Sequence, residues 1–216
     1  MDGKNLTVKG LKIVTIAYSI LFLSSFLILL SSITGIRFEI IYIGVIASFA
    51  SLISLAIIYY GIQFIYKGNK EFTKEHEKNT IFAKKLVFYG IIIYILGLFF
   101  LATTGIGVFL NEAVIMIDII QTLLLVPFWL ALVYLIKEIA DDRIVKLLWF
   151  AFFTRIILHI TSNNSYKIGV AFNVVSQNNL SFVFIMSFIS MIPSLVFIYC
   201  YYSTYQKLRN SNPLHN

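Results

Sequence analysis

The chain has 216 residues, of which 59 % are hydrophobic and 12 % are charged, and its formal net charge is +7. Soluble domains average about 45–50 % apolar and about 25 % charged residues, and a core of this chain length cannot hide so large an apolar surplus. The composition therefore excludes an ordinary soluble domain and indicates a protein that lipid surrounds. No basic patch with interleaved aromatic residues suits a nucleic acid, so we expect no nucleic-acid partner.

Six long apolar runs follow one another along the chain, and most reach the roughly 20 residues that a helix needs to cross a bilayer. The runs are continuous rather than alternating, which favours helices over barrel strands. Short connections predict antiparallel packing of successive helices. We expect an all-α integral membrane protein, a single domain over residues 1–216 with six transmembrane helices at 13–33, 40–65, 86–110, 113–136, 144–160 and 180–202.

The basic residues alternate between the two sides of this arrangement. Fourteen of the 17 Lys and Arg residues lie at the termini and in alternate connections, two lie in the other connections, and Arg155 lies inside the fifth run. This positive-inside pattern predicts a multi-pass protein of the cell membrane with both termini in the cytoplasm. Anionic lipid headgroups at the cytoplasmic face are the expected partners of these charges. Other membrane subunits, or a second copy of the chain, are further candidate partners.

Two connections are longer than the rest. The cytoplasmic connection 67–85 mixes Lys and Glu at helical spacing, pairing Glu71 with Lys74 and Glu75 with Lys78. We expect the second and third helices to project past the membrane there, with this surface either solvated or docking a partner.

The outer connection 161–179 is rich in Asn and Ser, and its apolar middle, 168–175, is a candidate interfacial segment. Asn163 and Asn179 each begin an N-glycosylation acceptor on the predicted outer side, although such short motifs also arise by chance. Asn5 begins a third acceptor, which should stay bare because it is predicted to be cytoplasmic.

Small residues recur in two of the runs. They are Gly44, Ser48 and Ser51 in the second run, and Gly90, Gly97, Gly105 and Gly107 in the third. Small side chains let helix backbones approach closely in lipid, so these positions predict packing seams. The alternative interpretation is a path for a small solute, lined by the same hydroxyl groups.

Three ionisable residues fall within membrane depth and form the candidate site. Asp118 lies in the fourth run, and Arg155 and His159 lie in the fifth, with Glu112 at the outer rim. The two helices run in opposite directions, so Asp118 and His159 lie at similar heights and Arg155 one turn deeper. One interpretation is a structural ion pair between the two helices. The other is an ion or proton relay, or a site for a ligand carboxylate.

The remaining residues that could take part in chemistry are better explained by structural roles. Pro127 and Pro193 lie near the middles of their runs, where they predict kinks or the broken helices of a transporter. Cys200 has no nearby base, and the pair Asp141–Asp142 is expected to mark a helix end at the headgroups. His159 is the single candidate haem ligand within the membrane, and HExxH, GxSxG and P-loop motifs are absent from the sequence. We therefore expect no enzyme activity, no metal and no cofactor.

The segment Lys9-Gly10-Leu11-Lys12, the pair Tyr60-Gly61, the Lys/Glu connection, and Gly90 with Gly97 resemble uncharacterised multi-pass membrane proteins of crenarchaea. The resemblance covers about the first half of the chain and implies an archaeal membrane protein, with no activity attached. Many seams and few buried polar groups favour a non-enzymatic interaction, assembly or accessory subunit. The alternative is a small-solute or ion transporter or channel that uses the polar cluster of the fourth and fifth helices.

Overall fold

A computed structural model describes residues 3–34, 37–104, 126–171, 188–189 and 191–211. These residues form helices and no strand, which confirms the prediction of an all-α chain for the part described. Many of the helical positions are Ile, Val, Tyr and Phe, whose intrinsic helix propensity is modest. An apolar run in lipid nevertheless forms a helix, because a helix provides the backbone N–H and C=O groups with hydrogen-bond partners within the same segment.

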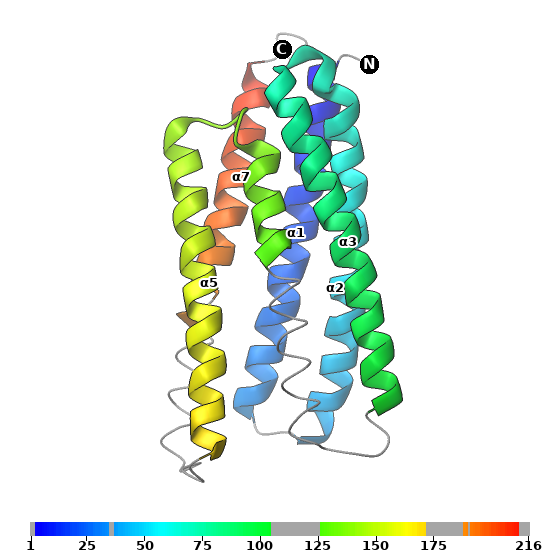
Figure 1. The fold of residues 1–216 in the computed structure, drawn as a ribbon, viewed down its shortest axis with the longest axis vertical. Coiled ribbons are helices and arrows are strands. Elements are labelled where there is room, and N and C mark those ends of the chain that lie inside the picture. The colour runs from blue at the N-terminus through cyan, green and yellow to red at the C-terminus, as the bar shows by residue number, and fades with distance from the viewer. Residues whose placement is uncertain (1–2, 35–36, 105–125, 172–187, 190, 212–216) are drawn as a thin grey trace.

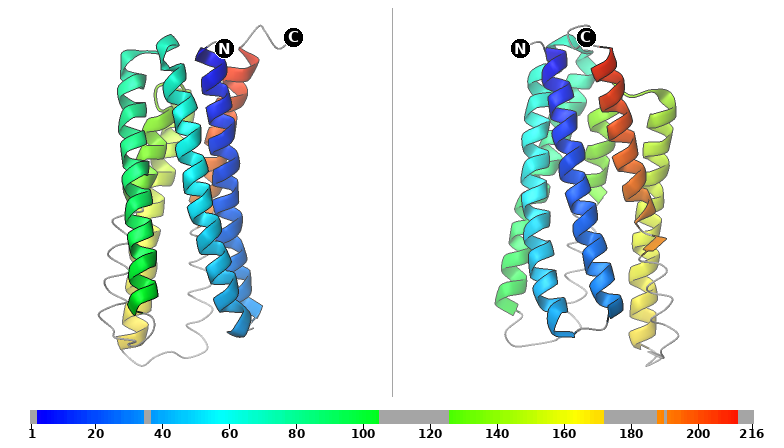
Figure 2. Two further views of the ribbon diagram at one scale, coloured as in Figure 1. Left: turned by 90° about the vertical axis from the view of Figure 1, so that its right-hand side faces the viewer. Right: turned by 180° about the vertical axis from the view of Figure 1, so that it is seen from behind.

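The helices are long and lie roughly side by side in an elongated bundle (Figures 1 and 2). In chain order they are α1 (Gly3–Thr34), α2 (Arg37–Gly68), the short 3-10 helix η1 (Asn69–Glu71), α3 (Lys74–Thr104), a helical segment at Val126–Ile136, α5 (Asp142–Ala171) and α7 (Ile192–Asn210). Both described termini, η1 and the turn at 137–141 lie at the same end of the bundle (Figure 1). We call this end the terminal end.

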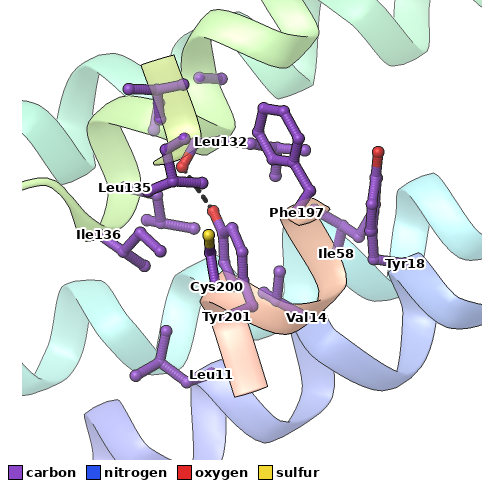
Figure 3. Packing of buried hydrophobic residues seen from close by; sticks show 14 of the residues in the cluster. Leu11, Val14, Tyr18, Ile58, Leu132, Leu135, Ile136, Phe197, Cys200 and Tyr201 are labelled. Carbon is purple, nitrogen blue, oxygen red and sulfur yellow. Dashed lines mark hydrogen bonds between the residues drawn. The ribbon is translucent and has the colours of Figure 1, made fainter. Parts of the chain in front are cut away.

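Helices that follow one another pack together, as the short connections predict. Helix α1 packs against α2 and α7, α2 packs against α3, and α5 packs against α7. Among the described residues, the core lies where α1, α2, α3, α5, α7 and the segment Val126–Ile136 meet, and Figure 3 shows part of it. There the Tyr201 hydroxyl donates a hydrogen bond of 2.6 Å to the carbonyl of Leu132, and the two residues are almost fully buried. This bond joins α7 to the segment Val126–Ile136.

Two details correct the sequence predictions, and a third fits them. Helix α5 continues to Ala171, so residues 161–171 are helical and do not belong to a connection. The polar stretch from Thr161 contains no proline, and nothing in it forces the helix to end where the apolar run ends. Pro193 lies in the first turn of α7, where its missing N–H needs no partner, and a turn at Met191 comes between α7 and the helical residues 188–189, which fits the predicted interruption of the helix. Glu71 does not lie on a helix with Lys74, because η1 ends at Glu71 and α3 begins at Lys74.

The prediction for Gly90 is also corrected, whereas Gly105 and Gly107, and the side-chain surroundings of Gly44 and Gly97, lie outside the described residues. An added Cβ at Gly90 would meet nothing within 4 Å, so Gly90 is not part of a packing seam. The seam of α1 and α2 instead contains Gly10 and Gly61, and an added Cβ at Gly10 would lie 2.6 Å from the Gly61 carbonyl oxygen. Gly3 and Gly68 make a second close approach of the same two helices, nearer the terminal end.

Candidate functional site

The three residues of the predicted polar cluster differ in what the structure describes. Asp118, like Glu112, lies outside the described residues. His159 lies in α5, but its side chain also falls outside the described part. Arg155 is described, one turn before His159 on α5, and its side chain turns towards the bundle interior. The proximity of Asp118, Arg155 and His159 therefore stays a prediction.

The Arg155 guanidinium lies over an aromatic face inside the bundle. Its Cζ is 5.3 Å from the centroid of the Trp129 ring, which belongs to the segment Val126–Ile136. The Tyr18 ring of α1 meets Trp129 edge-on at 5.5 Å, and the Tyr18 phenol is near enough to interact electrostatically with the guanidinium. The Phe197 ring of α7 also packs against the Trp129 ring, and the two ring centroids are 4.6 Å apart. Four helical segments thus meet around one cation.

Polar groups beside Arg155 complete this aromatic pocket. The Ser194 side chain of α7 lies beside the Tyr18 phenol. The Trp129 indole N–H has no acceptor in the part of the chain that the structure describes. A guanidinium is always charged, and a cation–π contact of this type contributes about 1–2 kcal/mol when it is desolvated. The pocket therefore combines a fixed positive charge with an additional N–H donor, and both favour an anionic group.

Tyr18, Trp129 and Ser194 were not among the residues predicted for this site. Their runs are apolar on all sides, so the sequence carries no signal for the face that each helix turns to Arg155. One usable signal was Arg155 itself, because a cation inside an apolar run needs aromatic or anionic neighbours. Among the described residues, no group of three or more His, Cys, Asp and Glu side chains could hold a metal ion.

The exposed faces of the helices change character towards the terminal end. On α1, exposed Ile16, Ile20, Leu23 and Leu27 recur at helical spacing, and exposed Lys9 and Lys12 precede them. On α5, exposed Lys146 precedes exposed Phe150, Phe153 and Ile157 at the same spacing. On α7 the order is reversed because the helix runs the other way, from Ile192 and Leu195 through Tyr199 and Tyr202 to Arg209.

Helices α2 and α3 repeat this succession. Exposed Phe49 and Ile53 of α2 lead to exposed Tyr60 and Lys67, and exposed Lys78 and Lys85 of α3 lead to exposed Tyr89 and Leu96. Five helices therefore carry an apolar band followed by basic residues at the same end, and on α2, α3, α5 and α7 exposed aromatic residues lie between them or near the boundary. In the part of the chain that the structure describes, two helices are long and apolar enough to cross a membrane by length and composition, namely Gly3–Leu23 within α1 and Lys74–Leu96 within α3. In the most apolar stretch of the second, only 17 % of the residues are buried.

A buried polar corner lies at the terminal end, where η1 joins α2 to α3. His76, Asn69, Thr80 and Thr7 are all buried there, and the Phe72 ring lies 5.1 Å from the His76 ring. Neither ring nitrogen of His76 has a hydrogen-bond partner among the described residues. His76 lies in the charged first turns of α3, ten residues before the predicted apolar run begins at residue 86. Burial lowers the pKa of His76 from 6.5 to about 4.

The remaining predicted positions are placed as follows. Asn163 lies in α5, Asn5 lies in α1, and Asn179 lies outside the described residues, so glycosylation stays a prediction. Asp142 begins α5 and Asp141 precedes it, which confirms that this acidic pair marks a helix end. Cys200 is buried, and its thiol faces the Ile144 carbonyl at 3.8 Å.

Comparison of the chain with known proteins finds no matching family, no matching curated protein and no matching solved structure.

Proposed function

We propose that the chain is a multi-pass protein of the cell membrane, with six transmembrane helices and both termini on the cytoplasmic side. The support is the succession of apolar and basic residues on the exposed faces of five helices, with exposed aromatic residues near the boundary on four of them. Lipid-facing residues, interfacial aromatic residues and cytoplasmic lysines of membrane proteins follow this order. The arrangement requires the terminal end to be cytoplasmic, because Lys and Arg accumulate on that side.

Reporter fusions or single cysteines at Lys74 and Ser165 test this topology. The variant Cys200→Ser removes the native thiol for the cysteine version. We expect Lys74 to be accessible from the cytoplasmic side alone and Ser165 from the outer side alone. A cytoplasmic Ser165 would contradict the proposed threading.

Within the membrane, the chain is proposed to act as a non-enzymatic interaction, assembly or accessory subunit. The observation that carries this proposal is the filled interior of the described bundle (Figure 3). Its core is a continuous set of apolar side chains, and several of its hydroxyl groups bond to the backbone of their own helix, as Thr15 does to Leu11 and Thr204 to Cys200. Such an interior suits a rigid scaffold that offers outer helix faces to lipid and to other subunits.

Gentle detergent extraction of the tagged chain tests the subunit role. We expect one membrane protein to copurify in a fixed ratio, and tagging that protein should recover the chain in return. Purification as a lone monomer or dimer at every detergent concentration would contradict the proposal.

A transporter or channel for a small anionic solute or ion is the second candidate, and the Arg155 pocket favours it. The guanidinium over Trp129 and the unpartnered indole N–H together suit a carboxylate or another anion. The anion can belong to a solute, or it can be the carboxylate of Asp118. In the second case Arg155 and Asp118 form a structural ion pair.

Replacement of the two charged residues singly and together separates these cases. If Asp118 and Arg155 form a structural pair, Asp118→Asn and Arg155→Gln should each lower thermal stability, and the double variant should recover most of the loss. If Arg155 serves a solute, the single variant Arg155→Gln should stay folded and lose anion flux into proteoliposomes. Unchanged stability together with unchanged flux would remove Arg155 from both roles.

A further inference from the structure

The terminal halves of α1 and α2 carry positive charge without a matching carboxylate. Lys9 and Lys12 of α1 and Lys67 of α2 are exposed, and none of the three has an ion-pair partner in the described part of the chain. Helix α1 contains no Asp or Glu, and α2 has only Glu39, at its opposite end. The carboxylate nearest to Lys67 in sequence, Glu71, is occupied, because it accepts hydrogen bonds from the backbone N–H groups of Gly3 and Lys4, and Asp2, the nearest to Lys9, lies outside the described residues.

One of these lysines is positioned across the seam between the two helices. The Lys9 ammonium lies 4.7 Å from the centroid of the Phe64 ring of α2, and the Tyr60 ring meets Phe64 edge-on at 5.0 Å. Phe64 and Lys67 are three residues apart, so they share a face of α2. Charges from both helices thus face the same side of the α1–α2 pair, which runs side by side along the bundle (Figure 2).

An apolar surface continues from these charges away from the terminal end. Ile16 and Ile20 of α1 and Ile53 and Tyr60 of α2 are exposed there, with exposed fractions of 37 to 58 %. A ligand that fills this surface needs a negative headgroup at the level of Lys9 and apolar chains below it. A nucleic acid or an acidic peptide meets the first requirement and not the second.

We infer that the face formed by Lys9, Lys12 and Lys67 binds the headgroup of an anionic phospholipid, whose acyl chains lie along α1 and α2. The headgroup phosphate accepts from the three ammonium groups, and the Phe64 and Tyr60 rings cover the glycerol level. This inference rests on the proposed membrane embedding and adds a lipid preference to one side of the bundle. The lysines that alternate with Glu in the first turns of α3 lack such a preference, because neighbouring carboxylates offset their charge.

The test compares two triple variants of equal charge. Lys9→Gln, Lys12→Gln and Lys67→Gln remove the proposed headgroup site, and Lys74→Gln, Lys78→Gln and Lys146→Gln remove three exposed lysines beside carboxylates elsewhere on the terminal end. Each full-length variant is reconstituted in phosphatidylcholine bilayers containing a minor fraction of spin-labelled phosphatidylglycerol. The relative association constant of phosphatidylglycerol over phosphatidylcholine is then measured by electron paramagnetic resonance.

We expect the first triple variant to lose most of the selectivity, by roughly a hundredfold at low salt, since each lysine near a headgroup contributes about fivefold. The control variant should change it by less than about threefold, and Phe64→Leu should weaken it without a change in net charge. Equal selectivity in the two triple variants would overturn the inference while leaving the membrane proposal intact. Failure of the unmodified chain to enter the bilayer would overturn both.

Discussion

Among single residues, His76 is in the least compensated environment. Its ring is fully buried, both ring nitrogens lack partners, and its described neighbours Phe72, Asn69 and Thr80 are uncharged. The charged groups nearest in sequence are all exposed, and they are Lys74, Glu75, Glu77 and Lys78. The folded protein therefore holds the neutral imidazole at the corner that joins α2, η1 and α3.

This burial predicts that stability falls on acidification. The pKa of His76 is about 4 in the folded chain and 6.5 without burial, so between these values the unfolded chain binds a proton that the folded chain does not. Stability is then complete above about pH 6.5 and decreases as pH falls towards 4, by up to about 3 kcal/mol from this residue. Thermal unfolding in detergent, followed by circular dichroism across this range, measures the slope.

The variant His76→Leu is the control for that slope. Leu has a similar volume and no nitrogen to leave unpaired, so the variant should be at least as stable as the unmodified chain at neutral pH. It should also lose the part of the acid dependence that comes from His76. An acid dependence identical to that of the unmodified chain would show that carboxylates, and not His76, are responsible.

At the scale of helices, the close contact of α1 and α2 depends on glycine. A Cβ at Gly10 would lie 2.6 Å from both the Gly61 carbonyl oxygen and Ile65 Cγ1, and 2.9 Å from the Ile65 backbone nitrogen. Backbone atoms cannot move aside as a flexible side chain can, so the two helices would have to separate. In lipid this matters more than in water, because helix association there depends on close packing.

Gly10→Ala is therefore expected to destabilise the fold by about 1–3 kcal/mol, the range of overpacked cores. Gly90→Ala is the matched control, since an added Cβ at Gly90 meets nothing within 4 Å. The control should be neutral or stabilise α3 by up to about 1 kcal/mol, because alanine is the better helix former. Thermal unfolding of the two variants in one detergent gives the comparison, and equal losses would rule out the proposed seam.

The same glycines show how much of this fold can be predicted from the sequence. Apolar runs predicted helices because hydropathy and length are local properties of the chain. Gly10 and Gly90 look alike in sequence, however, and only the rotation of each helix about its axis places one in a seam and the other at the surface. Trp129 and Tyr18 were missed beside Arg155 for the same reason, since a run that is apolar on all sides does not show which face is buried. The end of α5 was missed because a polar sequence can continue a helix beyond the apolar run.

Across the whole molecule, polar contacts join the segments of the terminal end into a closed ring. Glu71 of η1 binds the start of α1, and the Lys4 ammonium donates to the Ser211 carbonyl after α7 at 2.8 Å. Lys207 of α7 pairs with Asp141, and Asn79 of α3 donates to Glu138 at 3.3 Å. Asp141 and Glu138 both belong to the turn before α5, so this turn contacts α7 through Asp141 and α3 through Glu138. Because α3 follows η1 in the chain, the series of contacts closes on itself. This ring fixes the helices where the chain leaves the proposed membrane.

The contacts of this ring should differ in their contribution to stability. The Glu71 carboxylate accepts from two free N–H groups at the start of α1, at 2.6 and 2.9 Å, where the helix dipole also favours negative charge. Glu71→Ala should therefore cost about 1–2 kcal/mol. The side chains of Lys207 and Asp141 are 50 and 59 % exposed, so Asp141→Ala should cost less than about 1 kcal/mol. Thermal unfolding at low and high salt ranks the two, and salt should reduce the smaller effect further. A larger loss for Asp141→Ala than for Glu71→Ala would show that the ion pair, and not the helix cap, holds this end together.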